Sequence, residues 1–133
     1  MLNDARLRTL WLTVGWFGVG LTIYLSLTPY APDIGVEQGD KMAHLFAYGT
    51  LMLWFAQLYA NRGQRRMVAA LLAALGVMLE FVQGQTGWRE FSYVDMIADA
   101  AGVCLGWLLA PPRLPSLIGF AEAVLLRIGV MQR

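Results

Sequence analysis

Four long hydrophobic stretches constrain the fold of this chain more than any other feature. They cover about residues 10–28, 42–60, 67–82 and 94–110. A helix of about 20 apolar residues crosses the roughly 30 Å hydrocarbon core of a bilayer, and each stretch has or approaches that length. Of the 133 residues, 58% are hydrophobic and 14% are charged, which is unusual for a small soluble domain. The sequence therefore predicts an all-α integral membrane four-helix bundle, forming a single domain over residues 1–133.

The chain changes character after the fourth stretch. Pro111, Pro112 and Pro115 interrupt any helix there, because proline cannot continue the hydrogen-bond ladder. Apolar residues then recur at helical spacing over about residues 116–131, with charged residues spread between them. We expect this segment to form a C-terminal amphipathic helix that lies in the membrane interface and does not span.

The basic residues indicate how the expected spans are oriented. One side of the bundle carries Arg6, Arg8, Arg62, Arg65, Arg66 and Arg113, and the other carries Lys41 and Arg89. Arginine and lysine concentrate in cytoplasmic loops, so we expect a multi-pass protein of the cell inner (plasma) membrane with cytoplasmic N- and C-termini. The basic residues are few and scattered among the turns, so nucleic acid is not an expected partner.

The ionisable residues within the stretches fall at one end of the expected bundle. Successive spans reverse direction, so His44 at the start of the second span meets Glu80 at the end of the third. Asp95 and Asp99 join them from the start of the fourth span. Charge within a membrane is costly and usually functional, so these side chains predict a polar site on the extracytoplasmic face.

Small residues share helix faces with these polar groups. Asp95, Asp99, Gly102 and Gly106 lie on one face of the fourth span. Gly102 and Gly106 form a small-xxx-small step, which lets another helix backbone come close. The two aspartates are therefore predicted to face protein and not lipid.

Asp40, Lys41, His44 and Tyr48 share one face at the start of the second span. Asp40 fits two interpretations, a helix N-cap or a member of the site. His44 also fits two, a hydrogen-bonded packing residue or a group that takes part in chemistry.

Acidic residues outnumber basic ones at this end of the bundle. Asp40, Glu80, Asp95 and Asp99 stand against Lys41 and Arg89. Arg89 is expected to be the internal counterion of Glu80 or Asp95, since its planar guanidinium holds a carboxylate well. The remaining surplus requires a shared proton, a charged His44, a bound cation or water. One histidine with several carboxylates suits a divalent cation such as Mg²⁺, Mn²⁺ or Ca²⁺, although we assign no metal ligands and identify no cofactor from the sequence.

Three segments together resemble the VanZ-like family of membrane proteins. They are the run from Asp40 to Tyr48, the run from Glu80 to Gln83, and the run from Arg89 to Gly106. The resemblance covers over half of the chain and departs at Asp99, where many members have asparagine. It implies a small multi-spanning protein of the cell envelope with these polar residues as its signature. The first VanZ protein is associated with low-level resistance to the antibiotic teicoplanin, so the resemblance also implies a link to that resistance.

Three functions fit the sequence. An enzyme would act on a lipid-linked envelope substrate, with His44, Glu80 and Asp95 as candidate catalytic residues. A binding protein would recognise a membrane lipid or glycan headgroup, whereas a structural bundle would use the polar cluster only to lock its helices together. The candidate substrate-binding residues are Lys41, Tyr48, Gln83, Arg89, Ser92 and Asp99. No established hydrolase motif decides between these functions, and no pattern indicates an oligomeric state.

Overall fold

The computed structural model describes residues 5–33, 35–36 and 38–129. These residues form five helices and no strand, which confirms the all-α class. The helices are α1 (Ala5–Leu27), α2 (Gly39–Leu58), α3 (Arg62–Gln83), α4 (Tyr93–Leu109) and α5 (Leu117–Arg127). Each expected hydrophobic stretch corresponds to one helix, with ends that differ by a few residues.

Capping side chains fix the starts of three helices. The side chain of Asn61 accepts a hydrogen bond from the backbone N–H of Gly63, 2.6 Å away. Ser92 and Ser116 cap α4 and α5 in the same way. α3 consequently begins at Arg62, before the apolar stretch that starts at residue 67. The cap accepts a hydrogen bond from a backbone N–H group of the first turn, which has no partner within the helix.

The C-terminal helix is shorter than the expected segment 116–131. It ends at Arg127, and Gly129 adopts a positive φ of 74° that ends the helical path. Positions 130 and 131 lie outside the described residues.

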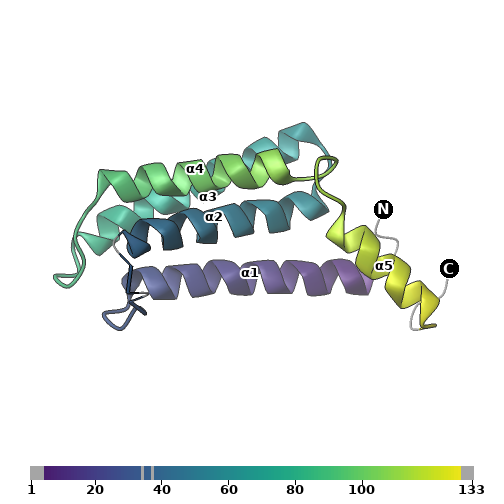
Figure 1. The fold of residues 1–133 in the computed structure, drawn as a ribbon, viewed down its shortest axis with the longest axis horizontal. Helices are drawn as coiled ribbons and strands as arrows, with labels where there is room; N and C mark the ends of the chain where they lie inside the picture. Colours follow the sequence, from purple (N-terminus) through teal and green to yellow (C-terminus); the bar gives the residue numbers. More distant parts are fainter. Residues whose placement is uncertain (1–4, 34, 37, 130–133) are drawn as a thin grey trace.

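Helices α1 to α4 lie side by side and alternate in direction (Figure 1). Residues 28–33 and the loop 84–92 lie together at one end, which we call the loop end. The start of α1, the end of α4 and the oblique helix α5 lie at the other end, which we call the α5 end. α2 and α4 form the most extensive helix pair.

Glycines bring the backbones of α2 and α4 into contact. A side-chain methyl group at Gly102 would overlap the carbonyl oxygen of Leu45, and one at Gly106 would overlap that of Gly49. The expected close approach at the Gly102 and Gly106 step therefore occurs, with α2 as the partner.

A pair of tryptophans joins α1 to α2. The rings of Trp11 and Trp54 stack with centroids 4.0 Å apart and planes inclined by 7°. Each indole N–H also donates a hydrogen bond to the other residue's carbonyl oxygen, at 3.3 Å from Trp11 and 2.9 Å from Trp54. Ring stacking and two hydrogen bonds thus both stabilise the contact between α1 and α2.

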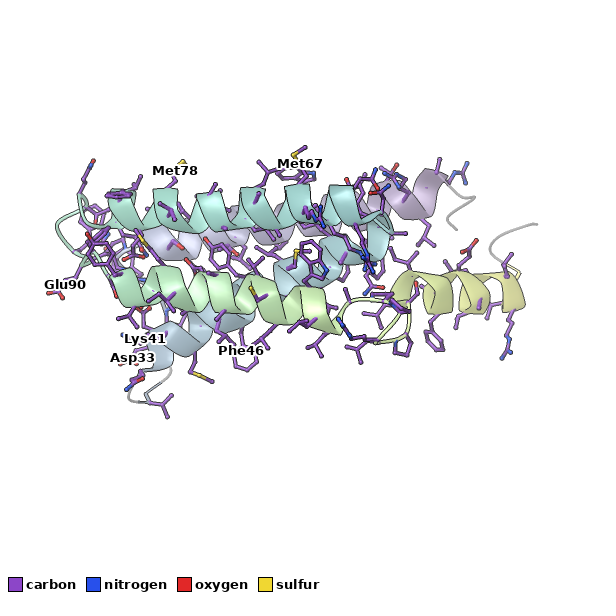
Figure 2. All side chains as sticks on the ribbon, turned by 90° about the horizontal axis from the view of Figure 1, so that it is seen from above. Asp33, Lys41, Phe46, Met67, Met78 and Glu90 are labelled. Atoms are coloured by element: carbon purple, nitrogen blue, oxygen red, sulfur yellow. The ribbon has the colours of Figure 1, made fainter. Side chains whose placement is uncertain are left out.

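Hydrophobic side chains cover much of the outer surface. Phe46, Met67 and Met78 point away from the helices (Figure 2) and are 63%, 64% and 54% exposed. Among the described residues, α1 and α3 are long and apolar enough to cross a membrane, whereas α4 has 17 residues. Membrane crossing by any of the four helices α1 to α4 stays a prediction.

Arg65 closes the α5 end. Its guanidinium donates hydrogen bonds to the carbonyl oxygens of Ala56, Tyr59 and Pro111, at 3.0, 2.6 and 2.6 Å. The last carbonyl groups of a helix lack partners within that helix. Arg65 therefore satisfies the end of α2 and ties it to the segment that follows α4.

Arg65→Ala is expected to lower the free energy of unfolding by about 3 kcal/mol, because hydrogen bonds from a charged donor contribute roughly 1.5 to 3 kcal/mol each and share one side chain here. Denaturant titration in detergent micelles measures this loss. Arg66→Ala removes the same charge from an exposed neighbour and is expected to stay within about 0.5 kcal/mol of wild type. Equal losses for the two variants would show that charge alone, and not the carbonyl contacts, matters.

Candidate functional site

His44 and Asp99 form the centre of a polar cluster at the loop end. Nδ1 of His44 lies 2.8 Å from Oδ1 of Asp99, which joins α2 to α4. On its other side, Nε2 of His44 lies 4.0 Å from Oδ2 of Asp95. The three side chains are 9%, 3% and 7% exposed, so the imidazole ring lies between two buried carboxylates.

Glu80 joins the cluster from α3 and is completely buried, with 0% of its surface exposed. Its Oε1 atom accepts a hydrogen bond from the backbone N–H of Ser92, 2.6 Å away. The Ser92 hydroxyl in turn accepts a 3.3 Å hydrogen bond from the backbone N–H of Asp95. Glu80 and Ser92 thus hold the first turn of α4 in place, a structural contact that the sequence does not predict for Ser92.

Three buried carboxylate oxygens accept no hydrogen bond from the described residues. They are Oε2 of Glu80, Oδ1 of Asp95 and Oδ2 of Asp99. A buried anionic oxygen without a partner is costly. Contacts between the described side chains therefore leave part of the negative charge of this cluster without a partner.

The two cationic side chains of this end contact different aspartates. Nζ of Lys41 lies 3.8 Å from Oδ1 of Asp95, and the guanidinium of Arg89 lies 3.4 Å from Oδ1 of Asp40. The expectation that Arg89 pairs with Glu80 or Asp95 is wrong. The loop 84–92 instead brings Arg89 to the start of α2.

Asp40 is not the N-cap of α2. That position belongs to Gln38, whose φ is 62° and whose side chain makes no capping hydrogen bond. Asp40 lies in the first turn of the helix, on the face of Lys41 and His44. The second interpretation of Asp40, as a neighbour of the site, therefore agrees with its position.

A polar cavity of about 380 Å³ lies at the loop end. Its charged lining residues are Asp40, Lys41, Arg89, Glu90 and Asp95, with Gln83, Ser92 and two aromatic residues completing the wall. Figure 2 shows Lys41 and Glu90 at this end of the molecule. His44, Glu80 and Asp99 do not line the cavity, and Asp95 connects it to their buried cluster.

Tyr48 and Gln83 stabilise the helices around the cluster. Tyr48 is 2% exposed and belongs to the hydrophobic core, one turn along α2 from His44. The side-chain amide of Gln83 donates a 2.8 Å hydrogen bond to the carbonyl oxygen of Ser26, which fastens α3 to α1. Their predicted contact with a substrate stays a prediction, and Gln83 also borders the cavity.

A larger hollow of about 870 Å³ lies elsewhere, between α1, α2 and α3. Its lining is mostly apolar and includes Trp16, Phe55, Leu71 and Leu75. None of the ionisable residues of the polar cluster lines it, so its surroundings suit hydrocarbon and not polar chemistry.

Asp40, His44 and Asp95 have the spacing of a metal-binding set. One side-chain ligand atom from each lies within 4.8 Å of the others. The helical spacing of the sequence places Asp40 and His44 on one face but identifies no metal ligands. The contribution of Asp95 depends on how α4 packs against α2.

No protein-family model and no solved structure matches the chain. An uncharacterized protein of Schizosaccharomyces pombe is 30% identical to it over 93 residues. The match covers 67% of this chain and 57% of the relative, so it spans little more than half of the relative's length. The resemblance to the VanZ-like family and the link to teicoplanin stay predictions.

Proposed function

We propose that the protein crosses a membrane four times through α1 to α4, with cytoplasmic termini, and that the cavity at its loop end recognises the polar headgroup of a membrane or envelope lipid. The observation that supports this proposal is the distribution of polar side chains, which is the reverse of that in a soluble protein. Apolar side chains cover the outside of the helices, while His44, Glu80, Asp95 and Asp99 are buried between them.

This distribution fits a lipid environment for physical reasons. Large exposed apolar surfaces on a monomeric protein mark a contact with a membrane or a partner. Ionisable residues in spanning helices face the protein interior and mark a site. Arg62 and Arg66 lie at the start of α3, and Arg113 follows the end of α4. Both helix ends lie at the α5 end (Figure 1), which the positive-inside rule assigns to the cytoplasm. α5 then lies at the cytoplasmic interface.

The cavity has the size and chemistry that headgroup recognition needs. Ligand pockets start at about 300 Å³, and this cavity has about 380 Å³. Lys41 and Arg89 line it and provide donors for a phosphate group. Their present carboxylate partners lie at 3.8 and 3.4 Å, so neither donor is held by a short hydrogen bond.

An alternative proposal is that the cluster only locks the helices together. Polar contacts join three helix pairs: His44 with Asp99, Glu80 with the start of α4, and Gln83 with the end of α1. The unpartnered carboxylate oxygens and the polar cavity favour recognition over this alternative. Catalytic roles for His44, Glu80 and Asp95 stay predictions.

Lipid that co-purifies with the protein tests headgroup recognition. Removing one charged donor to phosphate costs about 1.5 to 3 kcal/mol, so Lys41→Ala and Arg89→Ala are expected to reduce bound lipid at least about tenfold. Mass spectrometry of lipid extracted from purified protein measures the change. Arg66→Ala is the matched control at the α5 end and should retain the lipid. Retention of the same lipid in all three variants would count against the proposal.

A further inference from the structure

We propose that Asp40, His44 and Asp95 bind a divalent cation where the cavity, lined by Asp40 and Asp95, meets the buried cluster that contains His44. The ligand atoms of these residues lie within 4.8 Å of one another. This spacing matches a single cation with oxygen ligands at about 2.0 to 2.6 Å. The role of the cation toward a headgroup rests on the proposed function, whereas its binding is measured separately.

Asp95 provides an independent indication of a ligand. Its side chain is 7% exposed, and its Oδ1 atom accepts no hydrogen bond from the described residues. The nearest cationic group is Nζ of Lys41 at 3.8 Å, which is too long for a hydrogen bond. A carboxylate that is nine-tenths buried, borders a polar cavity and has one oxygen atom without a hydrogen-bond donor is suited to a cation.

His44 is oriented as a metal ligand. Nδ1 lies 2.8 Å from Oδ1 of Asp99. An ionised Asp99 carboxylate can only accept a hydrogen bond, and with it the neutral imidazole ring carries its proton on Nδ1. The lone pair of the neutral ring is then on Nε2, which faces Asp95. Metal-binding histidines commonly have this arrangement, in which a carboxylate fixes the ring through its second nitrogen.

A divalent cation would also balance the charges of the cluster. Four carboxylates, those of Asp40, Glu80, Asp95 and Asp99, stand against the cationic groups of Lys41 and Arg89. A dication supplies the two missing positive charges, with Glu90 left at the exposed rim of the cavity. It would also attract the phosphate of a headgroup between Lys41 and Arg89.

The ligand set favours a cation that accepts both nitrogen and oxygen. Carboxylates suit Mg²⁺, Ca²⁺ and Mn²⁺, while imidazole suits transition metals such as Zn²⁺. Mn²⁺ is the probe for the experiment, because it tolerates mixed ligands and free and bound Mn²⁺ give different electron paramagnetic resonance signals.

The full chain, purified in mild detergent, is titrated with Mn²⁺. We expect one bound ion per chain and a loss of affinity of more than about tenfold in Asp95→Asn and in Asp40→Asn. Asp40 is 54% exposed in its side chain, so Asp40→Asn keeps the test valid if Asp95→Asn fails to fold. Glu90→Gln removes the same charge from the same cavity and is expected to bind within about twofold of wild type.

Spectroscopy identifies the nitrogen ligand. Coupling of bound Mn²⁺ to a histidine nitrogen is expected in wild type and in Glu90→Gln, and is absent if His44 does not bind the ion. Absence of this coupling, absence of Mn²⁺ binding at millimolar concentration, or equal weakening by Asp40→Asn and Glu90→Gln would each overturn the proposed site.

Chelation separates this inference from the proposed function. Loss of co-purified lipid after metal removal from wild type would support a cation that bridges to the headgroup. Lipid retained without metal, together with normal Mn²⁺ binding, would overturn the bridge and leave the cation site standing. Bound lipid in a protein that binds no Mn²⁺ would overturn the cation site and leave headgroup recognition standing.

Discussion

Gly102→Ala is expected to lower the free energy of unfolding by at least about 3 kcal/mol. The new methyl group would lie 3.0 Å from the backbone nitrogen of Gly49 and overlap the carbonyl oxygen of Leu45. Both atoms belong to the α2 backbone, so no side-chain rotation relieves the clash and the helices must separate. Overpacking that side chains can absorb already costs about 1 to 3 kcal/mol. Unfolding in detergent, with the yield of monodisperse protein, measures the loss.

Gly20→Ala is the matched control for this variant. It makes the same substitution within a helix, at a position where no atom outside its chain neighbours and the adjoining backbone of its own helix lies within 4 Å of the new methyl group. Alanine favours a helix over glycine by about 1 kcal/mol, so this variant is expected to be as stable as wild type or more so. Equal stability of the two variants would contradict the backbone contact between α2 and α4.

Removing either member of the His44 and Asp99 pair is expected to cost about 3 to 5 kcal/mol of stability, because the remaining group stays buried without its partner. The double variant His44→Ala with Asp99→Ala is expected to lose less than the sum of the two single losses. The difference, a coupling energy of about 2 kcal/mol, follows from their 2.8 Å contact. A double-mutant cycle of unfolding free energies measures it.

The pair of Asp40 and Arg89 offers a control cycle at the same end of the protein. Their contact is 3.4 Å long, and the Asp40 side chain is 54% exposed. Water weakens such pairs, so the coupling energy is expected to stay below about 1 kcal/mol. Additive losses for His44 and Asp99 would show that the buried pair contributes no more than this surface pair.

Periodicity explains why much of the site could be predicted from the sequence. Asp95, Asp99, Gly102 and Gly106 share one helix face, and the structure buries all four. Residues at this spacing lie on the same face of a helix, and glycines on that face indicate that another helix packs closely against it. The alternating direction of the helices likewise places His44 near the aspartates. The shared helix face and the position of His44 both follow from residue spacing, which can be read from a single sequence.

Contacts made by flexible side chains could not be predicted in this way. The sequence predicts Arg65 only as a basic residue of a cytoplasmic turn, yet its side chain donates hydrogen bonds to three carbonyl groups at the α5 end. The expected pairing of Arg89 with Glu80 or Asp95 is wrong, because its loop has no periodicity from which the direction of its side chain can be predicted; the side chain contacts Asp40. The partner of Gln83, a backbone carbonyl on α1, has no signal in sequence at all.

The contact of α2 with α4 also determines how the loop end responds to a ligand. The two backbones meet at Gly102 and Gly106 without an intervening side chain, so no rotamer change alters their spacing there. His44 on α2 and Asp95 on α4 thus inherit their separation from a rigid frame, and a preorganised set of ligands loses little entropy on binding.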